Sequence, residues 1–255
     1  MSIRVVVVGA SGRMGMTAAR CFFNDPAFEV VGLVNREAKD ITEVNVPIEI
    51  DLAACLTRTR PDVMLEFTTG KTAGQHALTA VKLGVPTVIG ATGVPAAEIE
   101  ELQAAANKET PCLLVPNFSI GAVLMMQFSA MAAKYLPDAE IIELHHEKKV
   151  DAPSGTAMRT AEMISAARTK ATTPLPEQQL KSEGARGATV SNVTIHSVRL
   201  PGLLAHQEVH FGGVGELLTI RHDSMDRASF EMGIKLCCSQ VGRLSGFVVG
   251  MEHLL

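Results

Sequence analysis

A chain of 255 residues, with 47% hydrophobic and 20% charged residues, is long enough for one large domain or two medium ones. Its net charge of −4 does not favour a basic stripe of the kind that nucleic-acid binding needs, so we expect no nucleic-acid partner. The sequence shows neither a secretory signal nor an apolar run near the roughly 18 residues of a membrane span, so we expect a cytoplasmic protein with no membrane partner.

The cysteines argue against two common uses of this residue. They are odd in number, and none are spaced Cys-x-x-Cys, which disfavours both a disulfide framework and a zinc site. We therefore expect reduced thiols and no metal. The cysteines are Cys21, Cys55, Cys112, Cys237 and Cys238.

The first half of the chain alternates β-branched runs with helical stretches, as in a parallel sheet covered by helices. The pattern predicts strands at 3–8, 29–34, 63–67, 87–89 and 112–115, and helices at 14–23, 52–58, 71–83 and 96–108. The unbroken valine run at 5–8 is typical of a strand that is buried on both faces. This half is predicted to be a Rossmann-like, doubly wound parallel sheet.

The pattern changes after Pro116. It predicts helices at 120–135 and 157–167, strands at 140–147, 190–198, 207–211 and 216–222, and a polar loop over 169–188. Several of these strands alternate polar with apolar residues, so one sheet face should be packed and the other less so. We predict a second α+β domain with a mixed, mainly open sheet.

The last segment returns to helical periodicity over 227–244, and a short strand is predicted at 247–249. We therefore divide the chain into a dinucleotide-binding domain at 1–116 and a substrate-binding and oligomerisation domain at 117–226. Residues 227–255 are expected to be a C-terminal helix that returns to the first domain.

A glycine-rich stretch follows the first strand and opens the first helix. Gly9, Gly12 and Gly15 have the spacing Gly-x-x-Gly-x-x-Gly. Glycine allows a sharp turn close to a pyrophosphate, and a helix N-terminus offers free N–H groups. In this strand–loop–helix setting, the stretch predicts dinucleotide binding.

Asn35 and Arg36 stand at the end of the second strand, where cofactors are usually distinguished. An acidic residue there binds the ribose hydroxyl of NAD, whereas a nearby arginine favours the 2′-phosphate of NADP. Asparagine does not repel a phosphate, and arginine can pair with one. We therefore expect NADPH, NADH or both as cofactor.

The stretch from Glu143 to Thr156 is rich in groups that could act on a substrate. If the strand stays extended as far as Lys149, His145 and Lys149 lie on one face. Beyond them, Pro153, Ser154, Gly155 and Thr156 lead into a helix that Ser154 or Thr156 can cap. A helix N-terminus beside a lysine is a natural receptor for a carboxylate.

Taken together, the chain resembles the dihydrodipicolinate reductase family of bacterial lysine biosynthesis. The resemblance covers nearly the whole chain, and the run Lys-x-Asp-Ala-Pro-Ser-Gly-Thr from Lys149 to Thr156 is its most specific part. Other matching stretches are Glu66-Phe67-Thr68, Gly90-Ala91-Thr92-Gly93, Pro116-Asn117-Phe118-Ser119-Ile120-Gly121, His196-Ser197-Val198-Arg199 and His206-Gln207-Glu208-Val209.

The resemblance implies roles for individual residues. His145 would donate or accept a proton, Lys149 would donate one, and the substrate would be bound by His146, Ser154, Gly155 and Thr156. It also implies a homotetramer joined through the sheets of the second domains. The nucleotide would contact Gly9, Ala10, Ser11, Gly12, Arg13, Met14, Asn35, Arg36, Gly90, Ala91, Thr92, Val115, Pro116, Asn117 and Phe118.

The sequence departs from the family pattern at three places. Glu66-Phe67-Thr68-Thr69-Gly70 replaces Asp-Phe-Thr-x-Pro, Gly90-Ala91-Thr92-Gly93 replaces Gly-Thr-Thr-Gly, and Asn35 replaces an acidic residue. The first two changes leave backbone contacts possible. The third argues against strict use of NAD.

The expected function is reduction of 4-hydroxy-tetrahydrodipicolinate, a small cyclic dicarboxylate, to tetrahydrodipicolinate by NADPH or NADH in lysine and diaminopimelate biosynthesis. A nicotinamide-dependent amino-acid dehydrogenase acting on aspartate is the second reading, but it gives no reason for Lys149 together with Ser154 and Thr156. A nucleotide-sensing protein with a dead site is the third. It predicts loss of His145 or Lys149, and both are present.

Overall fold

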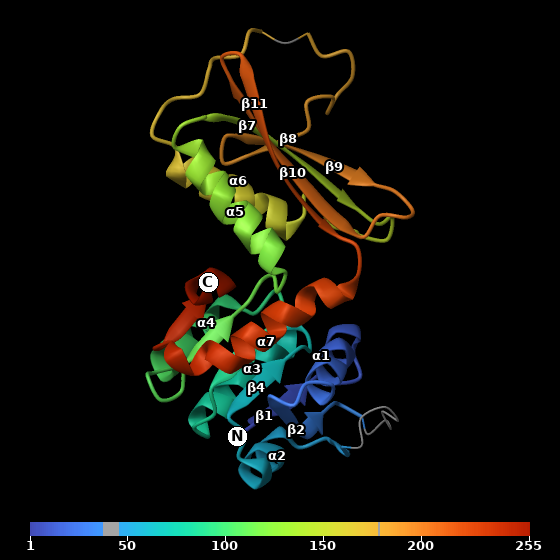
Figure 1. Ribbon diagram of the computed structural model, residues 1–255, viewed down its shortest axis with the longest axis vertical. Coiled ribbons are helices and arrows are strands. Elements are labelled where there is room, and N and C mark those ends of the chain that lie inside the picture. Colours follow the sequence, from blue (N-terminus) through green and yellow to red (C-terminus); the bar gives the residue numbers. More distant parts are fainter. Residues whose placement is uncertain (38–45, 178) are drawn as a thin grey trace. The chain divides into compact units, whose positions relative to one another are not determined.

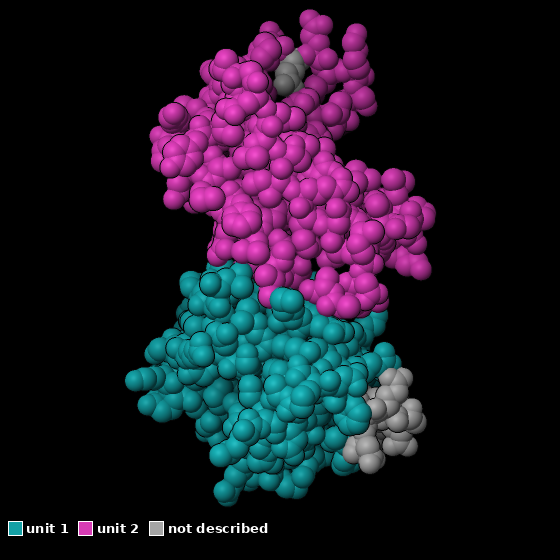
Figure 2. All heavy atoms as spheres, viewed as in Figure 1, with its two compact units in different colours: residues 1–118, 230–255 teal, residues 119–229 magenta. Residues whose placement is uncertain are grey.

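The computed structural model describes residues 1–37, 46–177 and 179–255, and its chain contacts form two compact units. Unit 1 contains Met1–Phe118 and Phe230–Leu255, and unit 2 contains Ser119–Ser229 (Figure 2). The C-terminal segment thus belongs to the same unit as the N-terminus. In the described part of the chain, no helix is long and apolar enough to cross a membrane.

Unit 1 is built on a parallel sheet, as the alternating pattern predicted (Figure 1). Among the described residues its seven strands lie in the order β12 (Phe247–Val249), β6 (Cys112–Leu114), β5 (Thr87–Ile89), β4 (Val63–Glu66), β1 (Ile3–Val8), β2 (Phe28–Val34) and β3 (Ile48–Glu49). Every neighbouring pair is parallel. Val5, Val6 and Val7 are fully buried, which confirms that β1 is covered on both faces.

The helices of unit 1 follow the strands in alternation. They are α1 (Arg13–Phe23), α2 (Leu52–Thr59), α3 (Gly70–Lys82), α4 (Ala96–Ala105) and α7 (Glu231–Gln240). Leu52 and Leu56 of α2 pack with Val6, Val8 and Met64 on one sheet face, where α3 also packs. Helix α1 contacts α7, which also packs against β4. The sheet is therefore doubly wound.

Unit 2 contains a mixed sheet with two helices. The strands lie in the order β11 (Glu216–Ser224), β10 (Ala205–Gly213), β7 (Asp138–His145), β9 (Val193–Arg199) and β8 (Ala188–Val190). Among the described residues of unit 2, only the β7–β9 pair is parallel. Helices α5 (Ile120–Ala133) and α6 (Gly155–Ala167) contact each other and the sheet (Figure 1).

One face of this second sheet forms the core of unit 2. Ile141, Ile195, Val209 and Phe211 are buried on this face. The neighbouring residues on β7, such as Ile142, point to the opposite face and are only partly buried. The expected difference between a packed and a more open face is therefore present.

Two predicted elements are interrupted in the structure. The single strand expected over 190–198 is two antiparallel strands, because Ser191 and Asn192 both have positive φ and form a two-residue turn between β8 and β9. The helix expected over 227–244 is α7 flanked by two 3-10 turns, η1 (Arg227–Phe230) and η2 (Val241–Arg243). Gly242 lowers the helix propensity of the second of these turns. A third 3-10 turn, η3 (Met251–Leu254), ends the chain.

Candidate active site

The glycine loop connects β1 to α1 in unit 1. Gly9 has a φ of +78°, which favours glycine, and a Cβ there would lie 2.8 Å from the backbone of Phe67. A Cβ at Gly15 would lie 2.2 Å from the carbonyl oxygen of Gly9, so the helix packs directly on the loop. The loop has the close backbone packing that a pyrophosphate-binding turn requires.

The start of α1 offers donors for an anion. Its N-cap is Gly12, which has no side chain to bond the N–H groups of the first turn. These groups and the positive end of the helix dipole favour a phosphate. In the loop Ala10 is buried, whereas Ser11 and Arg13 are exposed and Met14 is partly exposed.

Loops that follow three neighbouring strands meet at the carboxyl edge of the same sheet. The rings of Phe67, after β4, and Phe118, after β6, are 5.3 Å apart. A Cβ on Gly90, after β5, would lie 2.2 Å from the Phe67 ring and 2.7 Å from the Phe118 ring. The structure therefore brings together the loops around 90 and 118, for which the family resemblance implies contacts with the nucleotide.

The side chains in these loops differ in exposure. Ala91, Val115 and Phe118 are buried, so a nucleotide could contact them mainly through their backbone. Thr92 and Pro116 are exposed. Gly90 and Asn117 are partly exposed.

Asn35 and Arg36 differ in what they contact. The Asn35 amide donates to Ser11 Oγ at 2.5 Å, which joins the end of β2 to the glycine loop. The Arg36 side chain is 91% exposed, and its nearest described partner is Glu37 at 3.6 Å. Arg36 is therefore an exposed cation, and it follows directly in the chain the residue that contacts the glycine loop.

A buried carboxylate that sequence reasoning missed supports the loop after β4. Glu66 is fully buried, and its side chain accepts hydrogen bonds from the Thr68 backbone N–H at 2.5 Å and from His76 Nδ1 at 2.9 Å. Glu66 thus holds the segment that packs against Gly9. The acid before Phe-Thr in the sequence was the only signal of this role.

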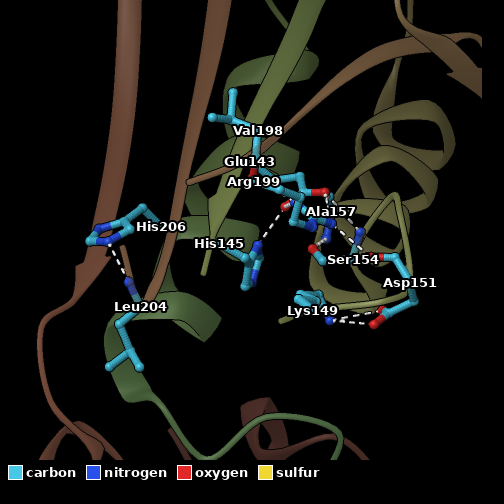
Figure 3. Close-up of polar contacts among 10 residues, drawn as sticks. All are labelled: Glu143, His145, Lys149, Asp151, Ser154, Ala157, Val198, Arg199, Leu204 and His206. Atoms are coloured by element: carbon cyan, nitrogen blue, oxygen red, sulfur yellow. Dashed lines mark hydrogen bonds and ion pairs between the residues drawn. The ribbon is translucent and has the colours of Figure 1, made fainter. Parts of the chain in front are cut away.

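In unit 2, Glu143 and His145 lie two residues apart on β7 and share one face of the strand. His145 Nδ1 lies 2.5 Å from Glu143 Oε2 (Figure 3). Burial raises the pKa of Glu143, but hydrogen bonds from His145, Arg199 and Ser197 outweigh it and hold the pKa at about 2. An ionised carboxylate only accepts hydrogen bonds, so the Nδ1–H of His145 is the donor.

Arg199, at the end of β9, completes the contacts of this carboxylate. Its Nη1 and Nη2 atoms donate to the two oxygens of Glu143 at 2.9 and 2.8 Å. The same nitrogens also donate to the carbonyl oxygens of Val198 and Asp151, each at 2.7 Å. Arg199 therefore joins β9, β7 and the loop that leads to α6.

The condition for placing His145 and Lys149 on one strand face, an extended backbone as far as Lys149, is not met. β7 ends at His145, and a turn follows in which the Lys149 N–H donates to the carbonyl oxygen of His146 at 3.1 Å. The strand ends there because His145 is the last residue of β7 that pairs with its two neighbouring strands. Its partners are Ala205 on β10 and Arg199 on β9.

The loop still gives Lys149 a defined position. Its Nζ donates to both carboxylate oxygens of Asp151 at 2.8 Å (Figure 3). Because Arg199 also binds the Asp151 carbonyl, the loop that carries Lys149 is tied to Glu143 and through it to His145. His146 lies outside the strand, and its Nδ1 accepts from the Lys148 N–H at 3.2 Å.

The start of α6 shows which residue is its cap. Ser154 Oγ accepts from the Ala157 N–H at 3.2 Å, so Ser154 and not Thr156 is the N-cap. The Ser154 N–H donates to Glu143 Oε1 at 3.3 Å. A Cβ on Gly155 would meet nothing within 4 Å, so the backbone at this helix start is open to a ligand.

Sequence reasoning missed Glu143, Asp151 and Arg199 as members of this network. Glu143 had a local signal, its two-residue spacing from His145. Arg199 had none beyond its place in a family motif, because it is 56 residues from Glu143 in the chain. Among the described residues, no cluster of three or more His, Cys, Asp or Glu could hold a metal ion, and all five cysteines are free and buried.

Comparison with known proteins identifies the family. The family model described as "Dihydrodipicolinate reductase, N-terminus" matches residues 3–118, and "Dihydrodipicolinate reductase, C-terminus" matches residues 121–255. Proteins named 4-hydroxy-tetrahydrodipicolinate reductase from Moorella thermoacetica and Bacillus velezensis are 47% and 45% identical to this chain. Each alignment covers 100% of this chain and 98% of the relative.

Solved structures agree with this assignment. A dipicolinate-bound dihydrodipicolinate reductase from Paenisporosarcina sp. TG-14 has a TM-score of 0.90 at 40% identity and covers 100% of both chains. An amine dehydrogenase from Mycobacterium smegmatis has a TM-score of 0.67 at only 13% identity, so it shares the fold alone. From the two family matches and these full-length relatives, we conclude that the chain belongs to the dihydrodipicolinate reductase family.

Proposed function

We propose that this protein reduces 4-hydroxy-tetrahydrodipicolinate to tetrahydrodipicolinate with a nicotinamide nucleotide, in lysine and diaminopimelate biosynthesis. The observation that carries the proposal is the joint anchoring of His145 and the Lys149 loop by Glu143 and Arg199, beside the open start of α6. The full-length relatives that carry the name of this activity support it.

The substrate-binding residues are proposed to be His146, Ser154, Gly155 and Thr156. A carboxylate is favoured at the start of α6, because the helix dipole is positive there and the backbone at Gly155 is open. Lys149 adds a cation on the loop that precedes this helix. The relative from Paenisporosarcina is described as bound to dipicolinate, a planar ring dicarboxylate, which supports a ligand of this class.

The nucleotide is proposed to bind the glycine loop and the loops around 35, 90 and 118 in unit 1. The tight Gly9–Gly15 contact and the uncapped start of α1 fit a pyrophosphate. When bound, the nicotinamide supplies the hydride. Asn35 brings no charge that would repel a 2′-phosphate, and Arg36 is a nearby cation, so we propose that NADPH is used at least as well as NADH.

The chain's own part in the reaction is to hold the substrate and to supply a proton. Loss of water from the 4-hydroxy compound gives the conjugated imine of the ring. Hydride addition to that system leaves negative charge on the ring, and a positioned acid must supply the proton that neutralises it. His145 and Lys149 are the proposed acids. A protonated imidazole or ammonium also stabilises the charge while it develops.

The assembly is proposed to be a homotetramer joined through the sheets of unit 2. The face of that sheet opposite the packed core carries Ile142, Leu144 and Val198, which are only partly buried in the single chain. Leu217 on β11 is 68% exposed. Light scattering coupled to gel filtration tests the proposal, since a monomer at micromolar concentration would contradict it.

The direct test of the function is consumption of NADPH in the presence of freshly generated product of dihydrodipicolinate synthase. We expect oxidation that depends on both this compound and the enzyme. The same protein incubated with aspartate and NADP⁺ should show no reduction of the nucleotide. If NADPH and NADH are each oxidised at the same rate with and without this compound, the proposed function is contradicted.

A further inference from the structure

The orientation of His145 depends on a single acceptor. Its Nδ1 contacts Glu143, and among the described residues its Nε2 makes no hydrogen bond. The imidazole side chain is 14% exposed, so it retains a path to a ligand. A histidine that transfers a proton needs one fixed tautomer, and the partner of the opposite nitrogen sets that tautomer.

Glu143 has no freedom to change partners. It is fully buried, and its partners include two donors at each oxygen, with Ser197 as a further donor. Oε2 accepts from His145 at 2.5 Å and from Arg199 at 2.9 Å, and Oε1 accepts from Arg199 at 2.8 Å and from the Ser154 N–H at 3.3 Å. The carboxylate therefore has a fixed orientation relative to both β7 and α6.

We propose that Glu143 is a positioning residue, held in place by Arg199, that fixes His145 as the Nδ1–H tautomer and ties it to the start of α6. The inference rests on the proposed function, in which His145 acts on a ligand bound at that helix. Glu143 is too deeply buried to touch the ligand and acts through His145. Nε2 of His145 is then always the nitrogen presented to the substrate.

Replacing Glu143 by glutamine tests this role with almost no change of shape. The amide oxygen is favoured at the Oε1 position, because Arg199 Nη2 and the Ser154 N–H both donate there and neither can become an acceptor. The amide NH₂ then takes the Oε2 position, where Arg199 Nη1 loses its acceptor and His145 Nδ1 must become an acceptor. The Glu143→Gln variant should therefore hold His145 in the opposite tautomer, with Nε2 protonated.

The expected kinetic effect follows because His145 must carry protons on both nitrogens to donate one from Nε2. The Glu143 carboxylate accepts from Nδ1–H in that state, whereas an amide NH₂ opposes it. In serine proteases, the matching change from aspartate to asparagine leaves the geometry intact and lowers kcat about 10⁴-fold through the wrong tautomer. Here Lys149 remains, so we expect a loss of kcat of roughly 10- to 100-fold, which does not exceed the lower limit of about 10²-fold for a general acid. The KM for NADPH should stay within about threefold, because Glu143 belongs to unit 2.

The chain offers a matched control on the same strand. Glu140 also pairs with a histidine and an arginine, since it contacts His196 Nε2 at 2.8 Å and also Arg186. It lies on the opposite face of β7 from Glu143. Glu140→Gln should leave kcat within about twofold of the unaltered enzyme. An equal loss in both variants would overturn the proposal, because it would report a general effect on the sheet.

A second measurement needs no substitution at Glu143 and no activity. Solid-state NMR of protein labelled with ¹⁵N-histidine, at a pH where the imidazoles are neutral, distinguishes the two tautomers. The His145 signal is identified by its absence in His145→Gln. We expect protonated Nδ1 in the unaltered protein.

Protonated Nε2 there, or kcat of Glu143→Gln within twofold of the unaltered enzyme, would overturn the role of Glu143. If the unaltered enzyme does not consume NADPH with the substrate, the proposed function fails, and the NMR result still decides the tautomer.

Discussion

Glu143 and Arg199 are 56 residues apart in the sequence and form two parallel hydrogen bonds of 2.9 and 2.8 Å in a buried site. Paired bonds of this kind are among the strongest polar contacts in proteins, and they fix orientation as well as distance. Removing one partner of a buried pair leaves the other charge uncompensated. The stability lost in this way is much larger than the stability that the intact pair contributes.

The low pKa of Glu143 predicts how stability responds to acid. Its pKa is about 2 in the folded protein against an ordinary 4.5, so the carboxylate contributes stability that is fully present above pH 4.5. This contribution, on the order of 3 kcal/mol, is lost as the pH falls from 4.5 towards 2. Glu143→Gln should lose less stability than the unaltered protein over that interval. Urea unfolding at several pH values measures this, and parallel pH dependences would contradict it.

Removing the proposed acids should affect turnover much more than nucleotide binding. We expect His145→Ala and Lys149→Ala each to lower kcat by about 10²- to 10⁴-fold. Lys148→Ala is the control, because Lys148 is adjacent to Lys149 and its side chain is 84% exposed. The measurements are kcat for the three variants and their NADPH dissociation constants. Turnover within twofold of the unaltered enzyme for both of the first two variants would refute the assignment.

Pyridine-2,6-dicarboxylate should inhibit competitively with the substrate. It copies the ring and both carboxylates that we place at Lys149 and the start of α6. Pyridine-2-carboxylate, which lacks one carboxylate, is the control and should inhibit more weakly. The inhibition constants and the shift in Tm with nucleotide present test this. If the dicarboxylate neither inhibits nor raises Tm, the proposed site is wrong.

NADPH should be used at least as well as NADH, with a preference of about tenfold or less. Arg36 can form a charge-assisted hydrogen bond worth roughly 1.5–3 kcal/mol when it is buried and aligned. Its side chain is 91% exposed, so solvent reduces that gain. The ratio of kcat/KM for the two nucleotides, measured before and after Arg36→Ala, tests the assignment. A clear NADH preference that the substitution leaves unchanged would show that Arg36 has no such role.

Gly15 should tolerate no side chain. A Cβ there would lie 2.2 Å from the Gly9 carbonyl oxygen, so Gly15→Ala must push α1 away from the loop. We expect a lower Tm and at least tenfold weaker nucleotide binding, since the pyrophosphate site depends on that approach. Gly242→Ala is the control, because a Cβ at Gly242 meets nothing within 4 Å. Equal nucleotide affinity in the two variants would contradict this account of the loop.

Local patterns in the sequence determined the element types and much of the site. The buried valine run of β1, the glycine loop and the Ser154 helix start each depend on residues close together in the chain, so spacing alone could predict them. The exact ends of helices and strands were harder to predict from the sequence. The turn at Ser191 and Asn192 depends on positive φ in residues that are not glycine, and the end of β7 depends on where its neighbouring strands stop.

Only the tertiary structure decided how the catalytic candidates are held. The period-two argument put Lys149 on the face of His145 only if the strand continued that far. The chain turns after His145, and Asp151 and Arg199 fix the Lys149 loop instead. No sequence spacing connects Arg199 to Glu143, because the parallel pairing of β7 with β9 brings them together across the intervening helix α6. The sequence by itself therefore determined which groups could do chemistry, whereas long-range strand pairing decided which of them are buried, paired and oriented, since burial and hydrogen bonding are properties of the packed chain.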